Sequence, residues 1–254
     1  MSELVDNVTL RTAVEAFAAA PAQDTYFEVL RNCFQGELLL DATTSTLEFT
    51  PDGSAIAAGS TLAFAGGKGP DGKTALFAFT RQAEAAKLHD DPDSVKTVAQ
   101  SASSLIEFAA KEHAWLYIDP AGPTCAIEFA DVGFAMRNHR NDAVKDALNI
   151  TGKTATMDAL AAGGKLLYAI DESGESPSVR TSVAPDGSPV FLAFTSAAEV
   201  VVRDVANAFT TVDISRVIDD ALAEPFTGLV INPAGPWVML DRADLLDVQA
   251  RLAS

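Results

Sequence analysis

The chain has 254 residues, of which 48% are hydrophobic, and carries a formal net charge of −17 at pH 7. This length suits two domains of ordinary size, and the apolar content is enough to bury cores, which excludes a disordered chain. Acidic residues are spread over both halves, so neither half is the cationic module that phosphate binding requires, and we expect no nucleic-acid partner.

The compartment is predicted from the N-terminus and the cysteines. The first ten residues lack the basic and apolar regions of a secretory signal. No uncharged apolar run reaches the roughly 18 residues that cross a bilayer, so no membrane contact is expected. Cys33 and Cys125 are the only cysteines, and their separation predicts free, buried thiols in a reducing compartment. We therefore expect a cytoplasmic protein.

In chain order, the first half alternates between helix and strand patterns. Helices are predicted at 12–20, 26–33, 101–111 and 128–137, and strands at 37–40, 75–79 and 96–98. Thr80 is expected to cap a short helix with Glu84 in its first turn. The helix at 101–111 is expected to bury Leu105, Phe108 and Ala109.

The second half repeats this order. A predicted helix at 143–148 corresponds to the first helix, with Val144 aligned to Val14. Later strands recur with a spacing of about 115–130 residues. That period is too long for a solenoid repeat. The sequence therefore predicts an α+β fold with two homologous domains, each a mixed β-sheet with flanking helices, related by internal duplication. We place them at 1–137, with a hairpin insertion near 46–69, and at 142–254, after a polar linker at 138–141.

One turn occurs twice, as Leu-Tyr-Ile-Asp-Pro-Ala-Gly-Pro at 116–123 and Leu-Val-Ile-Asn-Pro-Ala-Gly-Pro at 229–236. Asp or Asn before Pro favours extended geometry, and the Gly can take a positive φ, so a structural hairpin between two strands is the favoured interpretation. A ligand-binding loop is the alternative. Its candidate binding residues are Asp119, Pro120, Gly122, Asn232, Pro233 and Gly235.

The second half also carries a pattern of known type. Phe194-Thr195-Ser196 and Glu199, an amphipathic helix and the turn at 229–236 together resemble the N-terminal domain of the SseB family. The resemblance covers about residues 165–250. The first half fits more loosely, because Arg81 stands where the pattern has Ser and Asp119 stands where it has Asn. The resemblance implies a soluble bacterial α+β domain without an established catalytic site, and it carries over no functional residues.

The segment from Gly67 to Thr74 satisfies the P-loop pattern G-x-x-x-x-G-K-[ST]. A working P-loop needs a helix that begins at the Lys-Thr pair, so that backbone N–H groups face the phosphates. The residues at 75–79 predict a strand instead, which favours a hairpin turn. Nucleotide binding by Gly67, Gly72, Lys73 and Thr74, in a nucleotide hydrolase, is the alternative.

Other candidates for chemistry are weaker. His89, His113 and His139 have no second ligand at metal-binding spacing, and His113 is expected to cap a helix C-terminus. The acidic run at 90–93 lacks the spaced ligands of a calcium loop and predicts a helix-starting turn. The adjacent acids at 219–220 are expected on a solvated helix surface. We predict no catalytic residue, no metal and no cofactor.

These observations favour a non-catalytic binding or regulatory protein over an enzyme. The expected partner is another protein, or a small ligand in a groove between the two domains. Homo-oligomerisation is left open. An exposed apolar patch would favour a protein partner, and a deep pocket would favour a small molecule.

Overall fold

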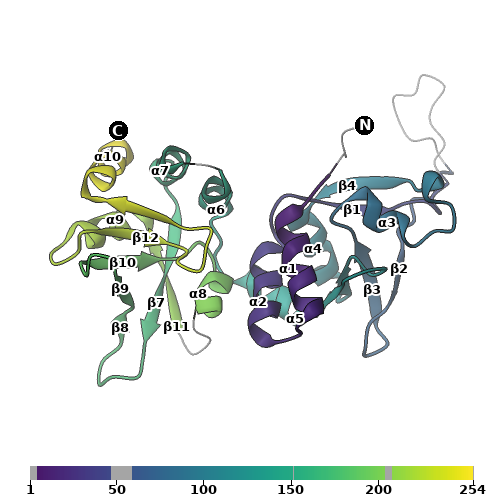
Figure 1. Cartoon of the computed structure of the whole chain (residues 1–254), viewed down its shortest axis with the longest axis horizontal. Coiled ribbons are helices and arrows are strands. Elements are labelled where there is room, and N and C mark those ends of the chain that lie inside the picture. The colour runs from purple at the N-terminus through teal and green to yellow at the C-terminus, as the bar shows by residue number, and fades with distance from the viewer. Residues whose placement is uncertain (1–4, 47–58, 151, 204–207, 254) are drawn as a thin grey trace. The chain divides into compact units, whose positions relative to one another are not determined.

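The structure, a computed structural model, describes residues 5–46, 59–150, 152–203 and 208–253. These residues form two compact units, Met1–Phe134 and Ala135–Ser254 (Figure 1). Each unit combines helices with mixed sheets, so the predicted α+β fold class is confirmed. Across the described residues, no helix has both the length and the apolar character that crossing a membrane requires.

The first unit begins with two helices, and most of its other helices follow strands. Its helices are α1 (Val8–Ala19), α2 (Gln23–Asn32), α3 (Gln82–Ala86), α4 (Ala102–Lys111) and α5 (Phe129–Arg137), with a 3₁₀ turn η1 (Pro92–Ser94). Its strands are β1 (Glu37–Asp41), β2 (Gly66–Lys68), β3 (Thr74–Ala78), β4 (Thr97–Ser101), β5 (Trp115–Ile118) and β6 (Cys125–Ile127).

The sheets of the first unit bring β3 and β5 side by side. β1 pairs with β4, and the second sheet has the order β2-β3-β5-β6, in which only β3 and β5 run parallel. Parallel neighbours need a crossover connection, which the segment from α3 to α4 supplies. A backbone bridge between Leu39 and Phe79 links the two sheets. Thr80, just after β3, therefore lies next to Asp119, just after β5.

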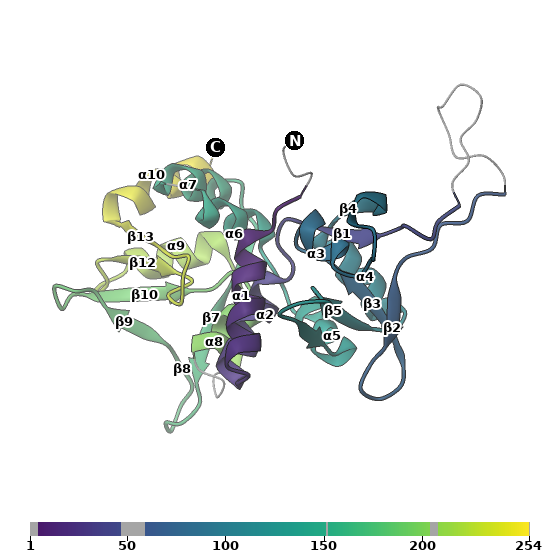
Figure 2. The same cartoon turned by 45° about the vertical axis from the view of Figure 1, so that its right-hand side comes forward.

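The second unit shows a similar order of elements, with one additional strand, β8. Its helices are α6 (Asp142–Asn149), α7 (Lys153–Ala161), α8 (Ala197–Arg203), α9 (Ile214–Leu222) and α10 (Arg242–Leu252). Its strands are β7 (Lys165–Asp171), β8 (Ser178–Val179), β9 (Thr181–Val183), β10 (Pro189–Ala193), β11 (Ala208–Asp213), β12 (Gly228–Ile231) and β13 (Val238–Asp241). β7 pairs with β11, and the second sheet has the order β13-β12-β10-β9 with β10 and β12 parallel (Figure 2).

The hydrophobic core of each unit lies between its sheets and the helices that follow β4 or β11. In α9, Val217 and Ile218 are buried against strand residues such as Phe191 and Leu229. In α4, Leu105 and Ala109 are buried as predicted. The prediction was wrong for Phe108, which is 51% exposed because it lies on the outer side of the helix.

Two further expectations are corrected. The N-cap of α3 is Arg81 rather than Thr80, although Glu84 does lie in the first turn. The helices α1 and α6 match in a different register, because their N-caps Asn7 and Asn141 both bond the chain at the start of the following strand. Val144 therefore corresponds to buried Leu10 rather than to Val14, a shift of one helical turn.

The expected boundary features lie as follows. Asn141, the last residue of the expected linker, is the N-cap of α6, and the two compact units divide between Phe134 and Ala135, within α5. The hairpin expected near 46–69 falls largely outside the described residues. Of its described part, Thr46 and Thr61 form an antiparallel bridge, and β2 follows at 66–68.

Candidate functional site

The two repeated turns share an unusual backbone conformation. Asp119 and Asn232 both have a φ of 51°, and both are almost fully buried, at 2% and 0% exposed. The expected extended geometry before Pro was wrong, because Asp and Asn tolerate the left-handed region and their side chains bond nearby backbone. Gly235 takes the expected positive φ, of 86°, whereas Gly122 does not. The buried residue takes the left-handed conformation in both turns, and in the second turn Gly235 also has a positive φ.

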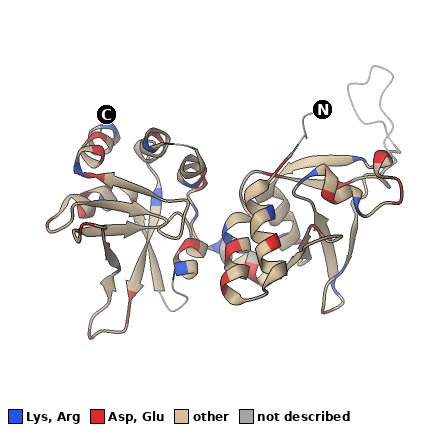
Figure 3. Cartoon of the chain, viewed as in Figure 1, with Lys and Arg blue, Asp and Glu red and all other residues tan. Residues whose placement is uncertain are grey.

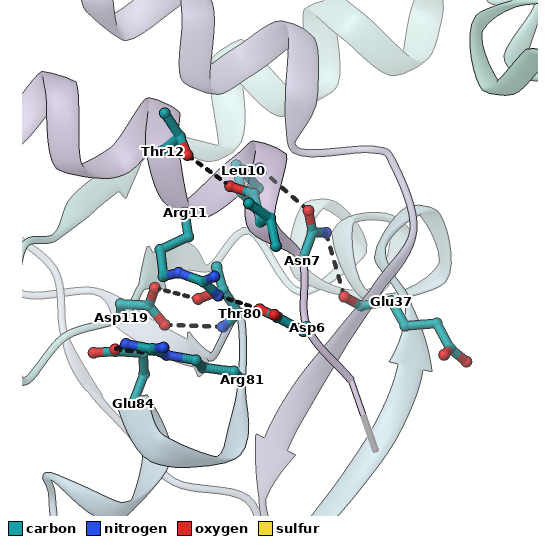
Figure 4. Close-up of polar contacts among 11 residues, drawn as sticks. Asp6, Asn7, Leu10, Arg11, Thr12, Glu37, Thr80, Arg81, Glu84 and Asp119 are labelled. Carbon is teal, nitrogen blue, oxygen red and sulfur yellow. Dashed lines mark hydrogen bonds and ion pairs between the residues drawn. The ribbon is translucent and has the colours of Figure 1, made fainter. Parts of the chain in front are cut away.

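In the first unit the buried residue fastens the turn to the end of β3. Asp119 Oδ1 accepts from the Thr80 backbone N–H at 2.9 Å, and Oδ2 accepts from the Thr80 hydroxyl at 2.7 Å (Figure 4). The Asp119 backbone N–H also donates to Ala78 O at 2.9 Å. The hydroxyl of Thr80 is thus directed at Asp119, and the N-cap of α3 is Arg81, which makes no side-chain cap bond.

We call the hydrogen bonds between the turn residue and the threonine a clamp. The second unit has a clamp of the same kind, formed by neutral groups. Asn232 Oδ1 accepts from the Thr195 backbone N–H at 2.9 Å, and its Nδ2 donates to the Thr195 hydroxyl at 2.8 Å. Thr195 is 2% exposed. Because the amide both donates and accepts, it satisfies the threonine without carrying a charge into the core.

The charge of Asp119 has an energetic cost. Burial raises its pKa from 3.8 to about 6, against the opposing hydrogen bonds from Thr80, and the nearby negative charge of Glu84 adds to the rise. Desolvation disfavours the charged form of a carboxyl group. Of the two turn residues Asp119 and Asn232, Asp119 is thus the one whose protonation is coupled to stability.

Charged side chains surround the clamp of the first unit. Arg11 of α1 pairs with Asp6, and Arg81 Nη2 donates to Glu84 Oε1 at 2.8 Å (Figure 4). Glu84 is 4% exposed and also pairs with Lys87. Burial acts to raise the pKa of Glu84, but the hydrogen bonds from Lys87 and Arg81 outweigh it and lower the pKa.

The second unit holds a simpler charge arrangement. Lys145 corresponds to Arg11 in the helix register given above, and it forms an ion pair with Glu199, the counterpart of Glu84. Both are buried, at 4% and 1% exposed. Ser196 occupies the position of Arg81, so one buried cation balances one buried anion. Figure 3 shows that the helices of this unit carry both acidic and basic residues.

Buried clamps of this kind serve to hold the fold. The side-chain polar atoms of Asp119 and Asn232 bond Thr80 and Thr195, which lie just after β3 and β10. The other four candidate binding residues, Pro120, Gly122, Pro233 and Gly235, are half-buried at the surface of the turns. A Cβ on Gly122 would approach Lys87 Nζ to 3.3 Å, so this turn also packs against the charged cluster.

The residues of the P-loop pattern form a β-hairpin. Gly67 lies in β2, Thr74 begins β3, and Gly72 and Lys73 lie in the connecting turn, so that a strand rather than a helix follows Lys73. Lys73 Nζ pairs with Asp71 at 2.8 Å. It lies 4.9 Å from the centre of the Phe129 ring.

The glycines of this hairpin are needed for packing. A Cβ on Gly67 would lie 2.8 Å from the Phe77 ring, and one on Gly69 would lie 2.1 Å from Trp115 Cδ1. Glycine within a strand often marks such a close approach. Of the two glycines in the P-loop pattern, Gly67 is therefore required by the Phe77 ring, and Gly72 by its φ of 79° in the turn.

We expect Gly69→Ala to lower the free energy of unfolding by about 1–3 kcal/mol, the cost of overpacking. The indole of Trp115 would have to move, which breaks its hydrogen bond to Asp71 at 2.9 Å. The matched control is Lys73→Ala, which removes an exposed ion pair and should cost about 1 kcal/mol or less. Urea unfolding of both variants measures the difference. A larger loss in the Lys73 variant would contradict this account of the hairpin.

The remaining candidates lie apart from these clamps. His89 Nε2 lies 2.6 Å from Asp41 Oδ2, and His139 Nε2 lies 3.2 Å from Lys165 O. His113 has a φ of 51° and follows the C-cap Glu112, so it ends α4 through its backbone. Burial raises the pKa of Asp41, but hydrogen bonds from Thr43 and His89 outweigh it and lower the pKa.

Acidic residues and cysteines complete this survey. Asp91 accepts from the Asp93 N–H and starts η1, as expected for the acidic run. Asp219 accepts from Gln249 at 2.8 Å, and Asp220 accepts from the Tyr168 hydroxyl at 3.0 Å. Both cysteines are free and buried, as predicted. The described residues contain no cluster of three or more His, Cys, Asp or Glu side chains suited to a metal ion.

Sequence analysis missed a groove in the second unit. It has a volume of about 410 Å³ and lies beside the turn at 232–236. We call it the Trp237 groove; its lining includes Leu148, Ile150, Lys153, Thr156, Trp237 and Met239. Trp237 and Ile150 are 62% and 60% exposed. The sequence placed Trp237 in the following strand, and no periodic pattern marks a single exposed aromatic residue at a strand entrance.

The first unit has a groove in a different place. It has a volume of about 500 Å³ and lies over β2 and β3, beside Phe108 and Glu112 at the end of α4. The corresponding face of the second unit carries Phe191, whose ring lies 5.0 Å from that of Phe226 and 5.1 Å from that of Tyr168.

Comparison with known protein families assigns the first unit. The SseB protein N-terminal domain matches residues 10–132. The first unit therefore carries an SseB N-terminal domain. The matched SseB domain thus includes the Asp119 clamp and its charged cluster, in the half where the resemblance seen in the sequence is the looser. No curated protein and no solved structure matches the chain.

Proposed function

We propose that this chain is a non-catalytic binding protein, whose protein partner docks at the Trp237 groove of the second unit. The observation that carries the proposal is the exposure of Trp237 and Ile150 at the rim of one groove. Tryptophan is among the residues that most often dominate binding energy at interfaces. Adjacent exposed apolar side chains commonly mark interaction sites.

The clamps support this assignment by their position. The turn at 232–236 leads directly into Trp237, and Asn232 at its start is fixed by two hydrogen bonds to Thr195. A rigid support lowers the entropy lost when a partner binds. We also propose that the two units arose by duplication, since their strands pair in the same order, and that the groove distinguishes the second copy from the first.

Co-purification from an extract of the source cells tests the function. A partner protein should be retained by the wild-type chain and lost with Trp237→Ala or Ile150→Ser. The matched control is Val183→Ser, because Val183 is 68% exposed on β9, at the opposite edge of the same sheet. Recovery of the same proteins with all variants, or of none with the wild type, would overturn the proposal.

A further inference from the structure

We infer that the occupant of the Trp237 groove is an extended, basic segment of the partner protein, which adds as a strand to the free edge of β13. This inference rests on the proposed function and specifies the conformation and the charge of the partner. It follows from three features of the groove: its edge strand, its apolar anchors and its acidic rim.

The edge strand determines the conformation. β13 is the outermost strand of the order β13-β12-β10-β9, and its register from Val238 to Asp241 is entirely with β12. Within the described residues, no strand pairs with its other side. Such an edge offers unpaired N–H and C=O groups, and an extended peptide can satisfy them by strand addition. Trp237, Val238 and Met239 line the groove, so the groove follows this edge.

The opposite wall limits how the segment can lie. Lys153 and Thr156, in the first turns of α7, line the groove across from β13. A peptide that lies between an edge strand and a helix runs alongside the strand, and its side chains alternate between two faces. Trp237 and Ile150, the exposed apolar residues of the lining, offer contacts for apolar side chains of the segment.

The rim determines the charge. Lys153 Nζ bonds Asp244 Oδ2 at 2.6 Å and lies 3.6 Å from Asp241 Oδ2, so one ammonium faces two carboxylates. Asp241 and Asp244 flank the groove without lining it, and together they outnumber Lys153, the charged residue of the lining, so the charge of these three side chains is net negative. A basic segment is complementary to this rim and is steered toward it. A second copy of the chain would bring the same negative charge, which disfavours self-association.

The test is to pan a random peptide library on the full-length chain and to measure the affinity of synthesised hits by calorimetry. Hits should alternate apolar and polar residues and contain Lys or Arg. Trp237→Ala should weaken them roughly thirtyfold, as expected for an aromatic hot spot, while Val183→Ser should leave the affinity unchanged. Hydrogen exchange should slow at 238–241, and N-methylation of alternate peptide amides should abolish binding.

The outcomes separate this inference from the proposed function. Hits that depend on Trp237 but leave exchange in β13 unchanged, or that tolerate N-methylation at every position, overturn strand addition and leave the binding site in place. Trp237-dependent hits without basic residues overturn the inferred charge. A library that yields no hit weakened by Trp237→Ala overturns the inference, and co-purification then decides the proposed function separately.

Discussion

Replacement of Lys145 by methionine is expected to lower the free energy of unfolding of the second unit by about 3–5 kcal/mol at neutral pH. The reason is that Lys145 and Glu199 form an ion pair in which both members are almost fully buried. Removing the cation takes away the ion-pair partner of a buried carboxylate. The double variant Lys145→Met/Glu199→Leu should recover most of the loss, because a well-packed apolar pair can replace a buried ion pair.

Urea unfolding followed by circular dichroism measures these differences. The matched control is Lys165→Met, which breaks an exposed pair with Asp213 and should cost about 1 kcal/mol or less. Equal losses in the Lys145 and Lys165 variants would show that the buried pair is not what stabilises this unit.

Much of the fold could be predicted from local patterns. Short apolar runs such as Leu38–Leu40 and Val190–Phe194 have the composition of buried strands. The Pro-Asp-Gly sequences at 70–72 and 185–187 have the composition of turns between strands. Local chemistry also separated the hairpin after Gly67 from a nucleotide-binding loop, because the residues after Lys73 are those of a strand.

The errors arose where distant residues decide the outcome. Thr80 has the composition of a helix cap, but Asp119, 39 positions later, takes both of its polar groups. The register of α6 against α1 could not be chosen from apolar spacing, because a helix repeats its buried face every turn. The pair of Lys145 and Glu199 joins residues 54 positions apart, and nothing in either neighbourhood marks the other.

The two clamps distribute charge differently around the same backbone. In the first unit, the buried anions Asp119 and Glu84 lie among Arg11, Arg81 and Lys87. In the second, one anion meets one cation, and the residue at the turn is a neutral amide. The buried carboxylate of Asp119 therefore lowers the stability of the first unit. The asparagine at the same place in the second unit is the side chain that would avoid this loss.

Asp119→Asn is expected to stabilise the first unit above neutral pH by up to about 3 kcal/mol, since each pKa unit corresponds to about 1.4 kcal/mol. The folded-state pKa of about 6 lies above the ordinary value of 3.8. The contribution of Asp119 to stability is therefore fully present below pH 3.8 and is lost as the pH rises through 6. An asparagine should keep both bonds to Thr80, as Asn232 does with Thr195, without this loss. Urea unfolding as a function of pH measures the effect.

The reciprocal variant, Asn232→Asp, provides the matched control. It should introduce into the second unit the pH dependence that Asp119→Asn removes from the first, because position 232 is fully buried and a carboxylate there would lose its hydration. The loss should grow as the pH rises, since burial raises the pKa of the new carboxyl group. If wild type and Asp119→Asn lose stability in parallel across this pH range, then Asp119 is hydrated in the folded protein, and the clamp of the first unit is open to solvent.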